Sequence, residues 1–227
     1  MELDLVLKKL KSKKELQDID NNFLIARINE SSILNLNPRS KKFKLKFKDL
    51  RKKLREVYGV FRQVKEHRDI EIYNRIFNET KVNTILDFGG GLEPLNYAKQ
   101  GNLTYYCTDI SKDIIKEINK YFKYNSIRGK AFLFNLVDND LDNLPKVDLC
   151  LALKLLESLE AIKKDISKKI LHEIKAKYIL VSFSKRSLAG KRIRKAGRSW
   201  FRKLLKELNY SYEVFDYDNE IFFLIKK

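Results

Sequence analysis

Two segments of the chain carry residue types that could together hold a nucleoside cofactor. The first, Asp87-Phe88-Gly89-Gly90-Gly91, follows the apolar residues Ile85 and Leu86 and is typical of a buried strand that ends in a glycine turn. Glycines in such a turn permit positive φ and let a ligand approach the backbone closely. The second segment ends at Asp109, 18 residues after Gly91, where a carboxylate could accept hydrogen bonds from both hydroxyls of a ribose.

The glycine run restricts the choice of cofactor. It does not fit G-x-G-x-x-G, because Pro94 stands close behind it, and no lysine follows to make a phosphate-binding loop. It resembles the D-x-G-x-G motif of enzymes that use S-adenosylmethionine. Asp109 alone does not separate this cofactor from NAD, whose ribose is held in the same way. Asp109 could also be the N-cap of a helix that begins near Ser111, and the two roles are compatible.

The end of the fourth expected strand indicates which methyl acceptors fit. Enzymes that methylate exocyclic amines of bases usually carry N/D-P-P-Y/F/W there, whereas this chain has Ala152-Leu153-Lys154-Leu155-Leu156. Methylation at pyrimidine C5 needs a cysteine nucleophile, and Cys150 lacks the usual adjacent proline. An acceptor with an available lone pair, such as guanine N7, needs no general base. The absence of an obvious acid and base is compatible with such an acceptor.

Short apolar strands alternate with helices after Thr80, which predicts a parallel sheet covered by helices. The expected strands are Thr84–Phe88, Leu103–Thr108, Ala131–Asn135, Val147–Leu153, Lys177–Ser184, Ser211–Tyr217 and Glu220–Ile225. Asp218-Asn219 separates the last two and suits a tight antiparallel hairpin. An α/β, Rossmann-like sheet that ends in an antiparallel hairpin is the layout of class I methyltransferases.

The first 80 residues show only helical periodicity, as at Leu3, Leu7 and Leu10. Pro38 interrupts the pattern and predicts two helical pieces joined at residues 35–40. We therefore expect a helical N-terminal module at residues 1–80. Residues 81–227 would form the cofactor-binding methyltransferase domain.

The charge of the chain is strongly positive and unevenly distributed. The formal net charge is +18, and residues 39–55 and 185–206 each contain ten basic side chains, against a single acid, Asp49, in the first window. Such clustering favours a polyanionic partner, above all RNA, over a generally lysine-rich surface. No apolar run approaches the roughly 20 residues of a membrane span. We therefore expect a cytoplasmic monomer that does not bind membranes.

Cys107 and Cys150 lie in apolar stretches without the spacing of a zinc site. We expect both to be buried free thiols and expect no metal.

Three segments together resemble the aminoglycoside-resistance type of 16S rRNA (guanine-N7) methyltransferase. They are residues 85–95, 152–156 and 181–191, and the likeness extends from about Arg68 to the C-terminus. The chain departs from that family where Gly90 replaces a usual cysteine, and where basic residues 192–198 replace a glycine-methionine-glutamate segment.

The resemblance implies a role for each residue of the site. The residues that would bind S-adenosylmethionine are Arg68, Asp87, Gly89, Gly91, Asp109, Asn135 and Leu136. Among them, Gly89 and Gly91 would line the methionine moiety, and Asp109 would hold the ribose. Asn135 and Leu136 would flank the adenine. Arg68 would clamp the cofactor carboxylate, unless it is only an exposed helix residue. Lys154 and Leu155 would face the methyl-transfer cavity.

The partner implied by the resemblance is 16S rRNA within the small ribosomal subunit. The resemblance also implies that the helical N-terminal module at residues 1–80 docks on RNA or the ribosome. For RNA contact we expect basic side chains beside the active site and a more remote group that grips phosphates. These are Lys185, Arg186, Lys191, Arg192, Arg194 and Lys195, and then Lys41, Lys44 and Arg51. Open alternatives are a methyltransferase of tRNA, protein or a small molecule, an RNA-binding protein without activity on the same fold, and, more remotely, an NAD enzyme.

Overall fold

The computed structural model describes residues 3–55, 70–98, 102–186, 191–193 and 198–227. Its N-terminal part consists of α1 (Leu3–Lys11), α2 (Asn21–Glu30) and α3 (Lys41–Leu54), with short 3₁₀ turns η1 (Lys14–Leu16) and η2 (Ile33–Asn35) between them. We call residues 3–54 the N-terminal module. Helices α2 and α3 begin at side-chain caps, as where the hydroxyl of Ser40 accepts from the amide of Phe43 at 3.0 Å.

The predicted break around Pro38 is confirmed, since it lies between η2 and α3. The expectation of one helical piece before the break is wrong, because α1 and α2 are separate helices. Asp20 caps α2 by accepting from the amides of Asn22 and Phe23, and no proline or glycine marks this start in the sequence.

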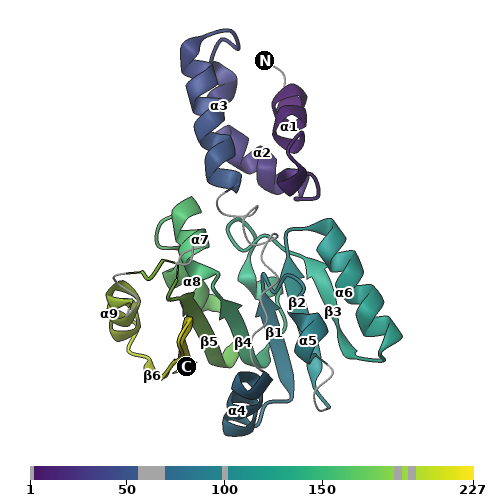
Figure 1. Cartoon of the computed structure of the whole chain (residues 1–227), viewed down its shortest axis with the longest axis vertical. Coiled ribbons are helices and arrows are strands. Elements are labelled where there is room, and N and C mark those ends of the chain that lie inside the picture. The colour runs from purple at the N-terminus through teal and green to yellow at the C-terminus, as the bar shows by residue number, and fades with distance from the viewer. Residues whose placement is uncertain (1–2, 56–69, 99–101, 187–190, 194–197) are drawn as a thin grey trace.

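Helix α4 (Ile70–Thr80) precedes the sheet and packs against it. Its side chains Ile72, Tyr73 and Ile76 belong to the same buried cluster as Ile85 and Tyr105 of the strands. In Figure 1 this helix lies at the end of the sheet opposite the N-terminal module.

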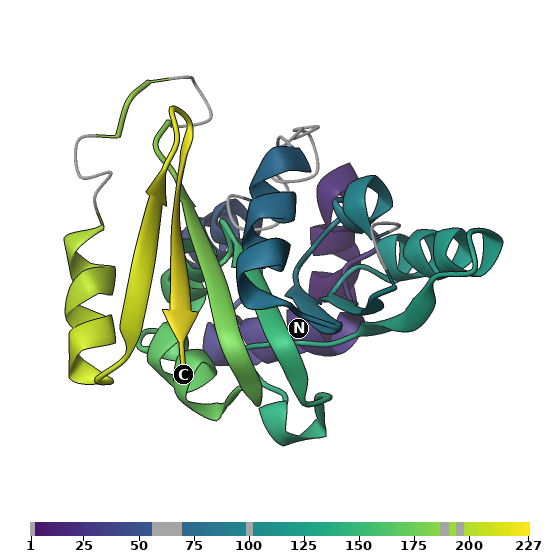
Figure 2. The same cartoon turned by 90° about the horizontal axis from the view of Figure 1, so that it is seen from below.

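A seven-stranded sheet forms the centre of the molecule, in the order β3-β2-β1-β4-β5-β7-β6. The strands are β1 (Thr84–Phe88), β2 (Thr104–Asp109), β3 (Arg128–Leu133), β4 (Val147–Leu153), β5 (Ala176–Ser184), β6 (Ser211–Asp216) and β7 (Glu220–Lys226). The first five are parallel, and β7 pairs antiparallel with both β5 and β6. This confirms the predicted fold class and the closing hairpin, which Figure 2 shows beside β5.

The strand β3 lies about three residues earlier than predicted, at Arg128–Leu133 rather than Ala131–Asn135. Its first three residues are exposed and pair with β2 through the backbone, with Thr104 opposite Arg128. A strand at the edge of a sheet needs no apolar side chains where it is exposed, so the apolar pattern begins too late to mark its start.

Helices cover both faces of the sheet. They are α5 (Pro94–Tyr97), α6 (Lys112–Tyr124), α7 (Leu156–Ile162), α8 (Ile166–Glu173) and α9 (Ser199–Glu207), with the 3₁₀ turn η4 (Leu141–Asn143) before β4. Alternate residues of one strand enter two separate cores: Cys150 and Ala152 belong to one, Leu149 and Leu151 to the other. Both faces are therefore buried, as in other parallel sheets. Within the described ranges, no helix has the length and apolar character of a membrane span.

Candidate active site

The glycine turn after β1 lies at the carboxyl edge of the sheet. Gly89 and Gly91 have positive φ angles of 58° and 54°, a region that glycine occupies without the steric penalty of a Cβ. The amide of Gly89 donates to the carbonyl oxygen of Thr108 at 2.8 Å, so the turn is tied to the end of β2. A Cβ at Gly91 would meet no atom within 4 Å. The turn therefore has open space on that side.

Gly90, between these two, is required by the carboxylate beneath it. A Cβ at Gly90 would lie 2.3 Å from Oδ2 of Asp87, far inside van der Waals contact. Asp87 is buried, at 1% exposure, and its Oδ2 accepts a hydrogen bond from the hydroxyl of Tyr105 at 2.8 Å. A side chain at position 90 would therefore have to displace the Asp87 carboxylate.

The end of β2 lies beside the glycine turn, because Thr108 pairs with Phe88. Asp109 is the last residue of β2, and its Oδ1 accepts from the amide of Ser111 at 2.8 Å. The N-cap of α6 is Ser111 itself, whose hydroxyl accepts from the amide of Ile114. Asp109 thus shapes the turn before α6 but is not the N-cap of that helix.

The end of β3 continues the same edge. The amide of Phe134 donates to the carbonyl oxygen of Asp109 at 3.0 Å, which places Asn135 and Leu136 next in line. Asn135 is held by both ends of its amide: Oδ1 accepts from the amide of Val137 at 3.0 Å, and Nδ2 donates to Asp138 at 2.7 Å. Leu136 is buried, at 6% exposure. The sheet therefore brings Gly89, Asp109 and Asn135 to one edge.

Lys154 and Leu155 follow β4, on the other side of β1. Lys154 has a positive φ of 52°, and its amide donates to the carbonyl oxygen and the hydroxyl of Ser182, at 3.0 and 3.1 Å. Leu155 packs on the glycine turn, since its Cδ1 would lie 3.1 Å from a Cβ at Gly89. These predicted residues therefore adjoin the cofactor motif.

A buried carboxylate anchors Lys154, and sequence reasoning missed it. Oε2 of Glu220 lies 3.4 Å from Nζ of Lys154, and its Oε1 accepts from the hydroxyl of Ser182. Glu220 is only 6% exposed. The available signal was an acidic residue at the start of the otherwise apolar strand Glu220-Ile221-Phe222-Phe223-Leu224-Ile225.

The family of the chain is decided by its sequence from before β1 to the start of β6. Residues 67–211 match the ribosomal RNA methyltransferase family FmrO. The chain is a member of this ribosomal RNA methyltransferase family. No curated protein matches its sequence.

Solved structures of similar fold extend over the whole chain of this methyltransferase. The 16S rRNA methyltransferase RmtF, in complex with S-adenosyl-L-homocysteine, has a TM-score of 0.75 at 18% identity and covers 100% of this chain and 99% of its own. The 16S rRNA methylase RmtB has a TM-score of 0.77 at 18% identity, with the same coverage. An rRNA methylase from Escherichia coli has a TM-score of 0.74 at 16% identity and covers 100% of both chains. The shared fold includes the N-terminal module.

The basic residues expected beside the active site differ in how far they are engaged within the methyltransferase. Nζ of Lys185 donates to Asp216 at 2.7 Å and to the carbonyl oxygen of Tyr217 at 2.8 Å. Arg186 donates to Asn219 at 2.9 Å, so both side chains brace the β6–β7 hairpin. Lys191 and Arg192 are exposed. Arg68, Arg194 and Lys195 lie outside the described residues.

Arg198, in the same basic window, is a structural residue. Its side chain is 3% exposed and donates to Glu157 at 3.0 Å and to the carbonyl oxygen of Ser184 at 2.7 Å. It also lies over the ring of Phe183 at 5.3 Å. Burial raises the pKa of Glu157, against the opposing effect of Arg198. Arg198 thus fixes the start of α9 to the end of β5.

Helix α3 presents the second basic cluster. Lys41 and Lys44 are exposed, whereas Phe43 and Leu54 on the opposite side of the helix are buried. Arg51 is half-buried, with its guanidinium 5.5 Å from the ring of Phe47. The helix therefore packs by its apolar side and turns most of its cations to solvent.

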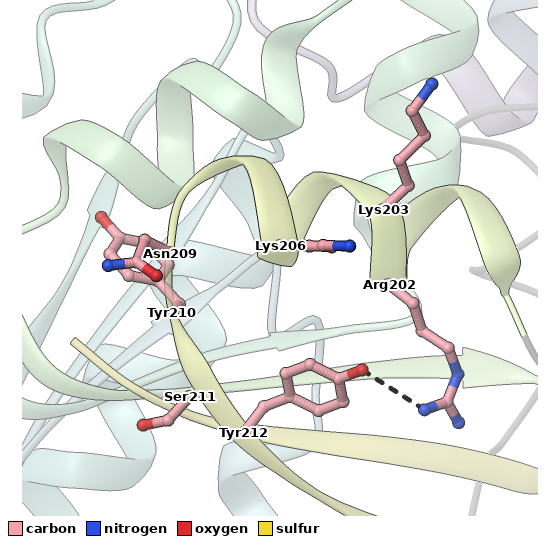
Figure 3. A pocket seen from close by; sticks show the side chains of 7 residues that line it. All are labelled: Arg202, Lys203, Lys206, Asn209, Tyr210, Ser211 and Tyr212. Carbon is pink, nitrogen blue, oxygen red and sulfur yellow. Dashed lines mark hydrogen bonds between the residues drawn. The ribbon is translucent and has the colours of Figure 1, made fainter.

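A basic hollow of about 630 Å³ lies between α9 and the edge strand β6 (Figure 3). Its lining contains no carboxylate: Arg202, Lys203, Lys206, Asn209, Tyr210, Ser211 and Tyr212. Arg202 is fixed there by its position 5.1 Å from the ring of Phe223 and a hydrogen bond of 3.5 Å to the hydroxyl of Tyr212. The hollow extends the positive charge along the flank of the methyltransferase.

Both cysteines are buried free thiols, as predicted. Burial raises the pKa of each thiol well above its ordinary value, and the charge of Asp87 acts in the same direction. Neither cysteine is therefore suited to act as a nucleophile. Among the described residues, no three His, Cys, Asp or Glu side chains gather closely enough to hold a metal ion.

Proposed function

We propose that this chain transfers a methyl group from S-adenosylmethionine to N7 of a guanine in 16S rRNA of the small ribosomal subunit. The observation that carries the proposal is the glycine turn at the carboxyl edge of the sheet in a member of an rRNA methyltransferase family. Two 16S rRNA methylases share the fold along the whole chain, and one of them holds S-adenosyl-L-homocysteine. That molecule is what S-adenosylmethionine becomes after it has given up its methyl group.

The residues along the edge fit the cofactor we propose. The positive φ angles of Gly89 and Gly91, and the open space at Gly91, suit close contact between backbone and the methionine moiety. Asp109 would accept from the ribose hydroxyls, and Asn135 and Leu136 would flank the adenine. Arg68 would pair with the cofactor carboxylate.

The reaction we propose requires positioning and little proton transfer. S-adenosylmethionine would supply an activated methyl group on a sulfonium, and the lone pair of guanine N7 would take that methyl in a single displacement in which the S–CH₃ bond breaks and S-adenosylhomocysteine leaves. N7 carries no proton, so no general base is needed, and orientation of the two reactants accounts for most of the rate enhancement. Lys154 and Leu155 would form the wall of the cavity in which the methyl group moves. Glu220 would keep Lys154 in place.

RNA would be held mainly through its phosphates. We propose Lys41, Lys44 and Arg51 of α3 as the remote grip, and Lys185, Arg186, Lys191, Arg192, Arg194 and Lys195 as contacts near the target base. Phosphate contacts of this kind position an enzyme without choosing a sequence. In this proposal the N-terminal module docks on the subunit.

The boundary near residue 80 between the helical domain at residues 1–80 and the methyltransferase domain at residues 81–227 stays a prediction. Helix α4, which lies just before this boundary, packs with the sheet.

Transfer of labelled methyl from S-adenosylmethionine tests the proposal. The acceptors are purified small subunits, naked 16S rRNA and bulk tRNA, with Asp109→Ala as the variant and Asp113→Ala, an exposed change on α6, as its control. We expect label in 16S rRNA with the wild type. Asp109→Ala should lose most of this label, and Asp113→Ala should label 16S rRNA as well as the wild type does. Label in tRNA alone would discard the rRNA assignment, and no label in any RNA despite cofactor binding would favour a protein or small-molecule acceptor.

A further inference from the structure

The N-terminal module contacts the loop after β2. Ile19 forms an antiparallel bridge with Ser111. The amide of Asp20 donates to the carbonyl oxygen of Ile110 at 2.9 Å. The amide of Lys112 donates to the carbonyl oxygen of Asp18 at 3.1 Å. The hydroxyl of Ser111 also donates to the carboxylate of Asp18. The module is therefore joined by main-chain pairing to the residues that directly follow Asp109.

A second contact reaches the loop after β3. Arg27 of α2 is 5% exposed, and its Nη2 donates to Asp138 at 2.6 Å and to Glu30 at 2.7 Å. The other carboxylate oxygen of Asp138 accepts from Nδ2 of Asn135 at 2.7 Å. An unbroken chain of hydrogen bonds thus runs from α2 through Asp138 to the side chain of Asn135.

The arrangement around Arg27 is sensitive to the loss of either partner. A buried guanidinium is tolerated when it is paired, and both ion pairs of Arg27 are made by its Nη2, so that removal of Asp138 leaves only the more exposed Glu30 as a counter-charge. The ring of Phe23 lies 5.2 Å from this guanidinium and restricts its position. The position of Asp138, and with it that of the Asn135 amide, is consequently set by a helix more than a hundred residues earlier in the chain.

We propose that α2 completes the adenosine half of the cofactor site and that Arg27 is the positioning residue that does so. The inference rests on the proposed function, which assigns Asp109 to the ribose and Asn135 to the adenine. Both loops touch the module that we expect to dock on RNA. Because coupling between two binding sites is reciprocal, docking that stabilises this contact strengthens cofactor binding, and bound cofactor strengthens docking.

The test compares Arg27→Met with Arg27→Lys, and uses Arg75→Met, a change at an exposed arginine on α4 paired with Glu79, as control. Calorimetry gives the Kd of S-adenosylhomocysteine, and steady-state kinetics give KM for S-adenosylmethionine and kcat. For Arg27→Met we expect Kd and KM to rise about tenfold, within the usual range of coupled polar contacts, with a much smaller change in kcat. Arg27→Lys keeps the charge and should recover most of the affinity, and Arg75→Met should match the wild type.

Asp138→Asn provides a second route that leaves α2 unchanged. It should weaken S-adenosylhomocysteine binding in the same way, and the double variant with Arg27→Met should bind little more weakly than either single one, because both remove the same contact. Unchanged Kd in folded Arg27→Met and Asp138→Asn, with tight binding by the wild type, overturns this inference alone. Failure of the wild type to bind S-adenosylhomocysteine overturns the proposed function, and this inference with it.

Discussion

At the scale of single residues, the glycine turn is specified by two different requirements. Gly89 and Gly91 are required by backbone conformation, whereas Gly90 is required by the space that the Asp87 carboxylate occupies. The lack of a side chain at Gly90 therefore leaves room for the Asp87 carboxylate and for its hydrogen bond with Tyr105. Replacement of Gly90 affects a different interaction from replacement of its neighbours.

Gly90→Ala should destabilise the protein by about 1–3 kcal/mol, because the new Cβ displaces Asp87 from its contact with Tyr105. Gly91→Ala is the matched control: it meets open space and should cost only about 1 kcal/mol of backbone strain. Urea denaturation measures both. If Gly90→Ala is as stable as the wild type, the Asp87 carboxylate is not where the structure places it.

The pair formed by Lys154 and Glu220 offers a second prediction at this scale. Their side chains are 16% and 8% exposed, so Glu220→Gln leaves a poorly solvated ammonium without its counter-charge. We expect a loss of about 2–3 kcal/mol in the free energy of unfolding, somewhat below the usual effect because glutamine can still bond Ser182. The double variant Glu220→Gln with Lys154→Met should recover much of this stability, as chemical denaturation would reveal. A double variant less stable than Glu220→Gln would contradict the pairing.

At the scale of elements, Asp148 joins three strands at the amino edge of the sheet. Its Oδ2 accepts from the amides of Asn83 and Thr84 at 3.0 and 3.1 Å, and its Oδ1 accepts from Lys177 at 2.6 Å. These hydrogen bonds, that of Lys177 first, lower the pKa of Asp148 to about 2. β1, β4 and β5 are thus fixed together at the edge opposite the cofactor motif.

A depressed folded-state pKa predicts a stability that depends on acid. The contribution of Asp148 is complete above its unfolded pKa of about 4 and is lost as the pH falls through about 2. Since Lys177 is largely exposed, we expect at most about 2 kcal/mol. Asp148→Asn should flatten the fall in stability between pH 4 and 2, and Asp113→Asn should leave it unchanged. A wild type whose stability does not fall in this window would refute the assignment.

Much of this level of organisation could be predicted from the sequence. β1, β4 and β7 are apolar runs, β6 alternates polar and apolar residues before the turn at Asp218-Asn219, and Pro38 marked the break before α3. The predicted position of β3 was about three residues too late, because an exposed edge strand is defined by backbone pairing rather than by its side chains. The start of α2 was missed because Asp20 caps it without any glycine or proline nearby.

The candidate site likewise contains residues that the sequence predicted and residues that it did not. Asp87, Gly89, Gly91 and Asp109 are neighbours of strand ends, so their motif and spacing indicated their place. Glu220 and Arg27 act across large separations in sequence, on Lys154 and Asp138 respectively. Periodicity and local motifs carry no information about such partners, which only the folded sheet brings together.

At the scale of the whole molecule, the net charge of +18 is concentrated on surfaces that could follow an RNA backbone. α3 carries one such surface on the N-terminal module, and α9, at the flank of the sheet beside β6, carries another (Figure 1). Binding through these surfaces should be strongly salt-dependent, because each neutralised phosphate releases counterions.

Lys41→Glu with Lys44→Glu should weaken binding to small subunits by about tenfold or more at physiological salt and reduce the salt slope by about 1.5 to 2. Lys116→Glu with Lys120→Glu makes the same charge change on exposed residues of α6 and should have a much smaller effect. Filter binding over a range of salt measures both. Equal effects of the two double variants would show that net charge, and not the α3 surface, governs binding.

The most direct test of the central claim is to find the methylated atom. Small subunits are treated with the enzyme and S-adenosylmethionine, and the extracted 16S rRNA is reduced with borohydride and exposed to aniline, which cleaves the chain at N7-methylguanosine. We predict one new cleavage, at a single guanosine, that depends on the cofactor and is absent with Asp109→Ala. Methyl incorporation into 16S rRNA without any new cleavage would contradict the N7 assignment, and no incorporation into that RNA would contradict the account as a whole.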